Sequence, residues 1–521
     1  MSTTSPDNTA AILPEDEILF SLEHVAKAWQ TPNWSASDTG DILTHFAAFA
    51  RDVLAPLNAT GDAEGAQLKN GRVQMPAGFA AAYGQLADNG WQGLSAPEAF
   101  GGLGASPLVA AGVSELFSGA NHAMQMVCNL VPGAITTLRR FGSTTQQDKW
   151  IPQLASGALL STMCLTEPQS GSDLSTIRTM ARPRNDGQED GEWLINGEKI
   201  FISGGDQDLS GGIIHLVLAR TGTMDDGIRG LSLFLCPAQP AIKVSRIEEK
   251  LGLHASPTCA LSFEDAEAEL IGPLGAGLKQ MFTLMNHARL DVALQGVAHA
   301  SRAAAISRTY ADERAQGRGP DGNPVTLSNH ADVVRMLDQQ RRLELGARAM
   351  CHVTLVEMQT DKRPALPEFL TPLCKVFGSE AGITAADLGI QIFGGYGYLR
   401  DYGIEQHWRD ARITAIYEGA NGIHEKTVAT RGLRDGGGSI EFAELIIELA
   451  AGQSAVLAKL DRWRDHKTTL LAADDVLPLA HDFATATADL FYHACWARIA
   501  ANAEHHPAPE EIDRLATGLG L

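Results

Sequence analysis

A single carboxylate stands out in the segment ITAIYEGANG, because Glu418 lies between an apolar run and a cluster of small residues. The segment after it, GIHEKTVATRGL, has helical spacing, and Asn421 is a suitable N-cap for that helix. Glu418 is therefore expected just before a helix N-terminus, which favours an anion, within mostly apolar surroundings, which disfavour one. Opposed influences of this kind prepare a carboxylate to act as a general base. The alternative is a solvent-facing loop acid.

Three other segments combine glycines with hydroxyl or aromatic residues and suit a bound heterocycle or phosphate. They are CLTEPQSGSDLS (164–175), KIFISGG (199–205) and QIFGGYGY (391–398). Each also has a plain structural interpretation: a capped turn, the end of an edge strand, and a helix C-cap at Gly394 and Gly395. Taken singly, none of them identifies a ligand.

The composition and the missing motifs exclude several classes of function. There is no GxGxxG after a strand, no GxxxxGK[ST], no GxSxG and no HExxH. The sixteen histidines and seven cysteines show no ligand spacing, so we expect no metal site, cysteines buried as small hydrophobes, and a surface position for the pair His505 and His506. The net charge of -21 makes nucleic acid a poor partner.

The beginning of the chain indicates the compartment. The stretch MSTTSPDNTAAILPEDEILF has neither the basic region of a signal peptide nor an apolar span long enough for a membrane. The scattered cysteines suit a reducing environment. A cytoplasmic protein without membrane insertion is expected.

Apolar periodicity predicts a mixed α and β protein whose central β part separates helical parts. In the β part, WLINGEKIFIS is expected to form a hairpin around Asn196 and Gly197. Beyond it we predict a helix of almost forty residues, followed by long helices at roughly 328–360 and 367–393. The expected division is an N-terminal helical domain (1–160), a middle β domain (161–276), a C-terminal four-helix bundle (277–433) and a helical extension (434–521).

These segments, taken in order, resemble the signature segments of the acyl-CoA dehydrogenase family. TEPQSGSD (166–173), NGEKIFISGG (196–205), LGLHASPTCALSFEDA (251–266), QIFGGYGY and RDARITAIYEGANGI carry the resemblance, which covers roughly residues 40 to 433. With its helical extension, the chain is most similar to the longer bacterial subgroup that includes 3-methylmercaptopropionyl-CoA dehydrogenase.

The resemblance implies a reaction and its partners. Glu418 would remove the pro-R α-proton of an acyl-CoA while the β-hydride passes to N5 of FAD, giving the trans-2-enoyl-CoA. The substrate would be 3-methylmercaptopropionyl-CoA or another short or medium acyl-CoA, and the electron acceptor would be electron-transfer flavoprotein. A homodimer or homotetramer is implied.

The resemblance also assigns site residues. FAD would contact Leu165, Thr166, Gly171, Ser172, Phe201, Ser203, Arg314, Gln316, Gln391, Gly394 and Gly395. The acyl-CoA would contact Ser172, Asn286, Arg289, Tyr417 and Gly419. This sequence departs from the family pattern at three positions, where Phe201 replaces the usual Trp and Ser203 and Ala420 each replace the usual Thr. The loss of the Thr hydroxyl at position 420 puts one hydrogen bond to FAD in doubt.

Three alternatives remain open at this point. An acyl-CoA oxidase on the same fold would pass electrons to oxygen. A flavin-containing scaffold or DNA-associated homologue would have no turnover. A family member with altered chemistry would decarboxylate or eliminate after removing the α-proton.

Overall fold

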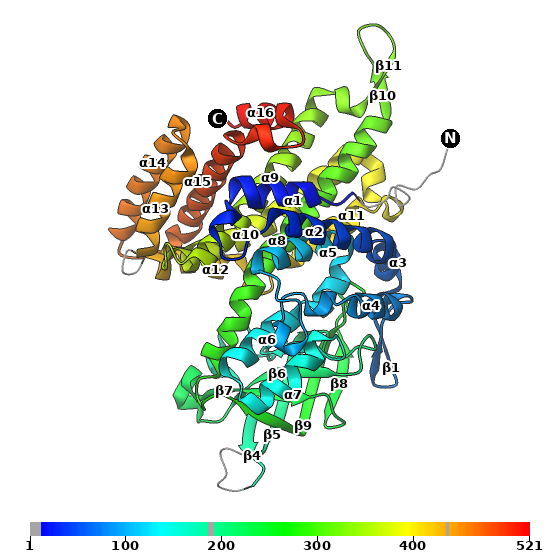
Figure 1. The fold of residues 1–521 in the computed structure, drawn as a ribbon, viewed down its shortest axis with the longest axis vertical. Coiled ribbons are helices and arrows are strands. Elements are labelled where there is room, and N and C mark those ends of the chain that lie inside the picture. Colours follow the sequence, from blue (N-terminus) through cyan, green and yellow to red (C-terminus); the bar gives the residue numbers. More distant parts are fainter. Residues whose placement is uncertain (1–11, 186–191, 434–436) are drawn as a thin grey trace. The chain divides into compact units, whose positions relative to one another are not determined.

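The structure is a computed structural model that describes residues 12–185, 192–433 and 437–521, apart from the side chains of residues 284, 286 and 287. Contacts between residues divide the chain into two compact units, drawn together in Figure 1. The first, here called the bundle unit, comprises residues up to 52, 106–120 and 289–521. The second, the barrel unit, comprises residues 53–105 and 121–288. The predicted four-part division along the sequence stays a prediction.

The barrel unit is built on a sheet of seven strands, which confirms the predicted β part. The strands are β3 (Leu160–Cys164), β4 (Met180–Pro183), β5 (Glu192–Ser203), β6 (Ile213–Arg220), β7 (Leu231–Pro237), β8 (Ile242–Ile247) and β9 (Thr258–Ile271). Their order is β3-β6-β4-β5-β9-β7, β8 pairs with β9, and a pairing between β6 and β7 closes the sheet into a barrel. Closure leaves few unpaired edges, which protects the sheet from pairing with other chains.

The predicted hairpin at Asn196 and Gly197 is wrong, because β5 continues through both residues as one strand. The long strand β9 pairs with both halves of β5, with a register shift between Ile195 and Gly197. Asn196 exchanges hydrogen bonds with Asp265 of β9, donating to its Oδ1 at 2.7 Å and accepting from its backbone N–H at 2.9 Å. A Cβ at Gly197 would lie 2.7 Å from Cα of Thr179. The glycine therefore serves a bulge and a close backbone approach.

Helices and a short hairpin complete the barrel unit. These are α3 (Pro56–Glu64), β1 (Gln67–Lys69), β2 (Arg72–Gln74), α4 (Phe79–Asp88), α6 (Leu130–Phe141) and α7 (Thr144–Ala155). Two long helices run from one unit into the other, namely α5 (Pro107–Cys128), which is kinked at Asn121, and α8 (Gly277–Glu313).

The bundle unit confirms the three predicted long helices, of which α8 is the first. The others are α9 (Ala331–Thr360) and α10 (Leu366–Phe393), accompanied by α1 (Glu15–Phe20), α2 (Ala36–Phe49), α11 (Ile404–Ala411), α12 (Asn421–Ala429) and the hairpin β10 (Ala315–Arg318) and β11 (Pro324–Thr326). Glycines let α8 and α10 cross almost backbone to backbone, since a Cβ at Gly382 would lie 2.5 Å from the carbonyl oxygen of Gly296. This close crossing fixes the position of nearby side chains on both helices.

The C-terminal part also belongs to the bundle unit, where α13 (Gly437–Ala450), α14 (Ser454–Leu471), α15 (Ala480–Ala500) and α16 (Pro509–Thr517) lie together (Figure 1). Helix α15 contacts α9, α10 and α12. Trp496 is fully buried and donates a hydrogen bond to the carbonyl oxygen of Arg342 at 3.1 Å. A Cβ at Gly346 would overlap the ring of Tyr492. The extension is therefore packed into the core rather than attached to its surface.

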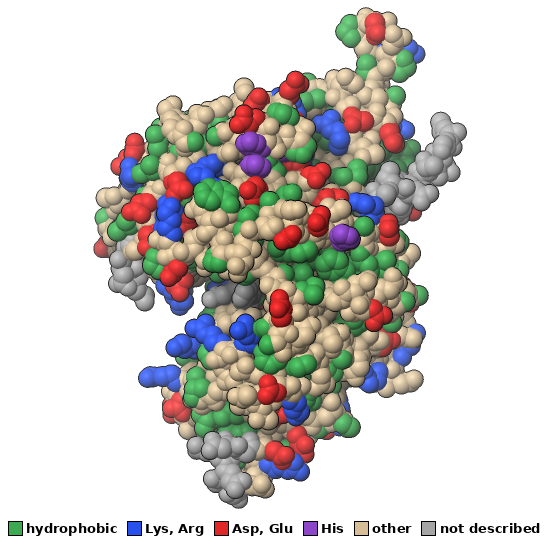
Figure 2. All heavy atoms as spheres, viewed as in Figure 1, with side chains coloured by type: hydrophobic (Ala, Val, Ile, Leu, Met, Phe, Trp, Pro, Cys, Tyr) green, Lys and Arg blue, Asp and Glu red, His purple; other side chains and the backbone are tan. Residues whose placement is uncertain are grey.

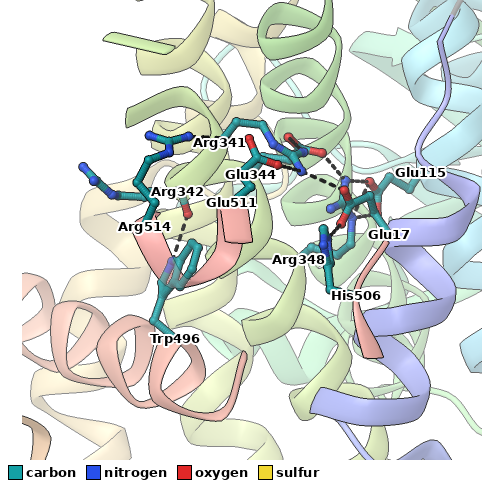
Figure 3. Close-up of polar contacts among 10 residues, drawn as sticks. All are labelled: Glu17, Glu115, Arg341, Arg342, Glu344, Arg348, Trp496, His506, Glu511 and Arg514. Atoms are coloured by element: carbon teal, nitrogen blue, oxygen red, sulfur yellow. Dashed lines mark hydrogen bonds and ion pairs between the residues drawn. The ribbon is translucent and has the colours of Figure 1, made fainter. Parts of the chain in front are cut away.

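A network of ion pairs joins this extension to α1, α5 and α9 (Figure 3). Arg341 pairs with Glu17, Glu344 and Glu511 at 2.7, 2.7 and 3.3 Å. His506 lies against Glu17 with 2.7 Å between Nε2 and Oε2, and is only 4% exposed. The predicted surface position of His506 is therefore wrong, because the ring is held in the interior against Glu17, a carboxylate distant in sequence.

All seven cysteines are free and buried, as predicted. None of the helices in the described ranges combines the length and hydropathy that crossing a membrane requires. On the face shown in Figure 2, acidic and basic side chains are interspersed rather than gathered into one basic patch.

Candidate active site

Glu418 lies in the bundle unit at a backbone position that few residues adopt. Its φ is 53°, in the left-handed region, and the residue lies three positions before Asn421, the first residue of α12. The predicted N-cap is wrong: Ala420 occupies the N-cap position, and no side chain caps the helix. The side chain of Asn421 is instead engaged elsewhere, because it accepts from Lys375 Nζ at 2.9 Å and donates to Glu380 Oε1 at 2.9 Å.

Two side chains hold the backbone carbonyl groups of Glu418 and of the residue after it. His424 Nε2 contacts the carbonyl oxygen of Glu418 at 3.0 Å, and Lys375 Nζ donates to that of Gly419 at 2.8 Å. Burial lowers the pKa of His424 to about 4, so the ring is neutral near pH 7 and must carry its proton on Nε2 to donate. Gly419 has a φ of 96°, and a Cβ there would lie 2.7 Å from His424 Nε2. Only glycine fits this position.

The surroundings of the Glu418 carboxyl group are more charged than the sequence suggested. Burial raises the pKa of Glu418 to about 7, while Arg289 and Lys375 act in the opposite direction and Asp291 adds to the rise. Its Oε2 atom is inaccessible to water and accepts no hydrogen bond from any residue that the structure describes. A carboxyl group that is about half ionised at neutral pH, with a spare acceptor atom, suits a general base.

Four of the five residues predicted to hold an acyl-CoA lie on α8 or beside Glu418, whereas Ser172 lies in the loop after β3 of the barrel unit. Tyr417 donates to Gln295 Oε1, and Gln295 donates to Asp291 Oδ2 at 2.8 Å, so this polar chain ties α8 to the segment that carries Glu418. Arg289 acts electrostatically on Glu418. The side chain of Asn286 lies outside the described part of the structure.

Another group of predicted residues gathers elsewhere in the bundle unit. The Arg314 guanidinium carbon lies 5.4 Å from the ring centroid of Tyr396, which brings the start of β10 to the turn after α10. Gln391, Gly394 and Gly395 in this region are exposed, and Gly394, with a φ of 62°, is the C-cap residue of α10.

The exposed backbone of Gln316 belongs to the same region. Its carbonyl oxygen contacts His330 Nε2 at 2.7 Å, which ties β10 to the residue before α9. The exposed amide and guanidinium groups around it are hydrogen-bond donors of the kind that phosphate oxygens accept.

In the barrel unit, the structure brings two of the predicted segments together. The carbonyl oxygen of Thr166 accepts from Ile200 N at 2.9 Å, and that of Leu165 accepts from Lys199 Nζ at 2.9 Å. The loop after β3 therefore lies along β5. Leu165 is buried and Thr166 half-buried, and farther along this loop are two exposed residues, Gly171 and Ser172.

The end of β5 presents an aromatic ring to the surface. A second register shift, between Lys199 and Ile202, places Phe201 at a φ of 59° with 60% of the residue exposed. Ile202 beside it is buried and Ser203 half-buried. An exposed planar ring close in sequence to the hydroxyl group of Ser203 suits contact with a flat heterocycle such as a flavin.

Two buried lysines were not predicted from the sequence, one beside the loop after β3 and one beside Glu418. Lys199 is fully buried and pairs with Glu167 at 2.8 Å, and Glu167 also accepts from the N–H groups of Arg178 and Thr179. Lys375 plays the corresponding part next to Glu418. The available signal was a lysine at the edge of an apolar run in KIFIS and inside one in TPLCKVFG, because such a lysine needs a buried partner.

Replacing Lys199 with methionine should lower the free energy of unfolding by about 3 kcal/mol, since it leaves the buried Glu167 carboxylate without its cation. Urea unfolding followed by circular dichroism measures the loss. Lys243→Met is the matched control, because its ion pair with Glu264 is more than half exposed and should contribute less than about 1 kcal/mol. Equal losses in both variants would contradict this interpretation of Lys199.

Comparison with known proteins places these groups in context. Three family models match the chain: the acyl-CoA dehydrogenase N-terminal domain over residues 37–158, the middle domain over 162–266 and the C-terminal domain over 275–433. The chain is 39% identical to 3-methylmercaptopropionyl-CoA dehydrogenase of Ruegeria pomeroyi, over 89% of this chain and 84% of that protein.

Solved structures of acyl-CoA dehydrogenases have the same fold as this chain. The structure of butyryl-CoA dehydrogenase from Megasphaera elsdenii has a TM-score of 0.68 at 26% identity, covering 77% of this chain and 99% of that one. An acyl-CoA dehydrogenase from Bacillus anthracis, solved in complex with FAD, has a TM-score of 0.75 and covers 93% of this chain and 85% of that one. At 24% identity the latter shows the fold alone.

Proposed function

Because the chain belongs to the acyl-CoA dehydrogenase family, we propose that it converts an acyl-CoA thioester to the trans-2-enoyl-CoA, with Glu418 as the base that removes the α-proton. The observation that supports this role most directly is the Oε2 atom of Glu418, which is buried and accepts no hydrogen bond from any described residue. Burial also raises the pKa of this carboxyl group to about 7. A base works best when its pKa lies near the working pH.

The acidity of the α-proton requires further help from the protein. A thioester α-proton is much less acidic than an ordinary carboxylic acid, so the developing enolate oxygen needs hydrogen-bond donors. We assign this role in part to the backbone N–H of Glu418, next to the two carbonyl groups that His424 and Lys375 hold. Arg289, Tyr417 and Gly419 are proposed to orient the thioester, together with the predicted residues Asn286 and Ser172.

FAD is the proposed cofactor, and bound FAD would accept the hydride that leaves the β-carbon. In the barrel unit, the exposed ring of Phe201 and the hydroxyl of Ser203 fit contacts with the flavin, as do Leu165, Thr166, Gly171 and Ser172. In the bundle unit, Arg314 and Gln316 suit its pyrophosphate, and Gln391, Gly394 and Gly395 are proposed to reach the FAD of a second subunit.

The substrate and the partners follow from similarity. A relative that is 39% identical is named for 3-methylmercaptopropionyl-CoA, which supports that thioester or another short or medium acyl-CoA as the substrate. Electron-transfer flavoprotein is proposed as the acceptor, a homodimer or homotetramer as the assembly, and the cytoplasm as the compartment.

Anaerobic mixing of the FAD-loaded protein with 3-methylmercaptopropionyl-CoA, butyryl-CoA or palmitoyl-CoA tests the proposal. We expect the visible flavin absorbance to bleach with at least one of the two shorter thioesters and an equimolar amount of enoyl-CoA to form. Admitting air then separates dehydrogenase from oxidase, because an oxidase recovers its absorbance rapidly and releases hydrogen peroxide. If neither 3-methylmercaptopropionyl-CoA nor butyryl-CoA reduces the flavin, the proposed activity on short and medium acyl-CoAs is wrong.

A further inference from the structure

Lys375 is a fully buried lysine on α10 whose ammonium group faces two oxygen atoms of the segment that carries Glu418. It donates to the carbonyl oxygen of Gly419 at 2.8 Å and to Oδ1 of Asn421 at 2.9 Å. Both acceptors belong to the four residues that begin with Glu418. A buried ammonium with two acceptors among the described residues is costly, which points to a role beyond packing.

The backbone that Lys375 holds is strained. A non-glycine residue in the left-handed region costs about 1 to 2 kcal/mol, so Glu418 keeps its φ of 53° only because its neighbours fix it. Lys375 fixes the chain on the C-terminal side of Glu418, and His424 contacts the carbonyl oxygen of Glu418 itself. Removing Lys375 releases the first of these two restraints.

Lys375 also acts on Glu418 through its charge. Among the described residues, the charged or titratable groups that act on Glu418 or contact it are Arg289 and Asp291 on α8, Lys375 on α10, Tyr417 beside it and His424 on α12. Arg289 stays cationic at all relevant pH values, and His424 is neutral near pH 7. Burial lowers the pKa of Lys375 to about 8, with Glu418 and Glu380 opposing the fall. Lys375 is therefore mostly charged at pH 7.

We propose that Lys375 is a positioning residue for the α-proton base: its ammonium group holds the Gly419 carbonyl and the Asn421 side chain, and its positive charge favours the ionised form of Glu418. The proposal rests on the function proposed above. It predicts that removing the charge makes Glu418 harder to ionise, whereas a purely structural lysine would affect stability alone.

The test uses the FAD-loaded full-length protein and the variant Lys375→Met, with two measurements. The first is the rate constant of flavin reduction by the active acyl-CoA between pH 5.5 and 9. The second is the infrared carboxyl band of Glu418, isolated by subtracting the spectrum of Glu418→Gln, as a function of pH. We expect both midpoints to move upward from about 7 by about one pH unit or more, the usual effect of losing a nearby opposite charge.

The sign of the rate effect follows from this shift. A base with a higher pKa is ionised only at higher pH, so Lys375→Met should lose about tenfold more activity at pH 6 than at pH 9. Lys375→Arg keeps the positive charge and should keep the wild-type midpoint. Lys362→Met is the matched control, because Lys362 is a half-exposed lysine of the same unit, paired with Glu448. It should change neither midpoint.

The two proposals fail in different ways. If Glu418→Gln reduces the flavin as fast as the wild type, the base assignment is wrong. If Glu418→Gln is inactive but folded Lys375→Met keeps both midpoints near 7, the role of Lys375 is refuted while the base assignment stands. If Lys375→Met does not fold, Lys375→Gln, which is neutral but polar, replaces it under the same criteria.

Discussion

Replacing Glu418 with glutamine is expected to slow flavin reduction by the active acyl-CoA about a thousandfold or more. Glutamine has nearly the shape of glutamate but cannot accept a proton, so the variant loses general base catalysis, which typically contributes about 10²- to 10⁴-fold. Anaerobic stopped-flow absorbance measures the rate. FAD content and acyl-CoA affinity should stay close to those of the wild type, because the substitution leaves the shape of the site unchanged.

The stability of Glu418→Gln provides the control for this result. Burial raises the pKa of Glu418 to about 7, so ionising it in the folded protein is unfavourable. The contribution of protonated Glu418 to the free energy of unfolding is present in full below the unfolded-state pKa and is lost as the pH rises through about 7. Glu418→Gln avoids that loss and should melt at the same temperature as the wild type, or a higher one, at pH 8. A large fall in melting temperature would attribute the lost activity to misfolding instead.

Replacing Arg348 with methionine is expected to destabilise the bundle unit by about 5 kcal/mol, the upper end of the range for breaking a buried ion pair. Arg348 on α9 is fully buried and donates from Nη2 to Glu115 at 2.8 Å and to Glu344 at 2.9 Å (Figure 3). Burial alone would lower the pKa of Arg348, and the two carboxylates raise it instead. Methionine fills much of the same volume but leaves Glu115 without its cation and leaves Glu344 paired with Arg341 alone.

Urea unfolding followed by circular dichroism measures this loss. Arg335→Met is the matched control on the same helix, since the pair between Arg335 and Asp332 is mostly exposed and should contribute less than about 1 kcal/mol. Adding Glu115→Gln to Arg348→Met removes the carboxylate that has lost its cation and should restore part of the stability. A loss below about 1 kcal/mol in Arg348→Met would show that the network is not a major source of stability.

Local patterns in the sequence were sufficient to predict the long elements and to single out Glu418 as the proposed base. The apolar spacing predicted α8, α9 and α10 because a helix of thirty residues averages over local exceptions. Glu418 was identifiable because a carboxylate between apolar and small residues is locally anomalous. The motif segments were found in order for the same reason: their residues are close together in the sequence.

Tertiary structure decided what depended on partners distant in sequence. Asn196 and Gly197 favour a turn locally, but β9 pairs along the whole of β5 and converts the turn into a bulge. Asn421 had the composition of an N-cap, but Lys375, forty-six positions away, takes its side-chain oxygen.

The same physical reason explains the remaining differences. Lys375 and Arg289 come close to Glu418 through the packing of α8 and α10, which no local pattern encodes. His506 is buried because Glu17, 489 residues away, supplies a carboxylate. The sequence by itself therefore determined the elements and the identity of the proposed base, whereas the charges that set the pKa of that base depend on contacts that form only when distant segments pack together.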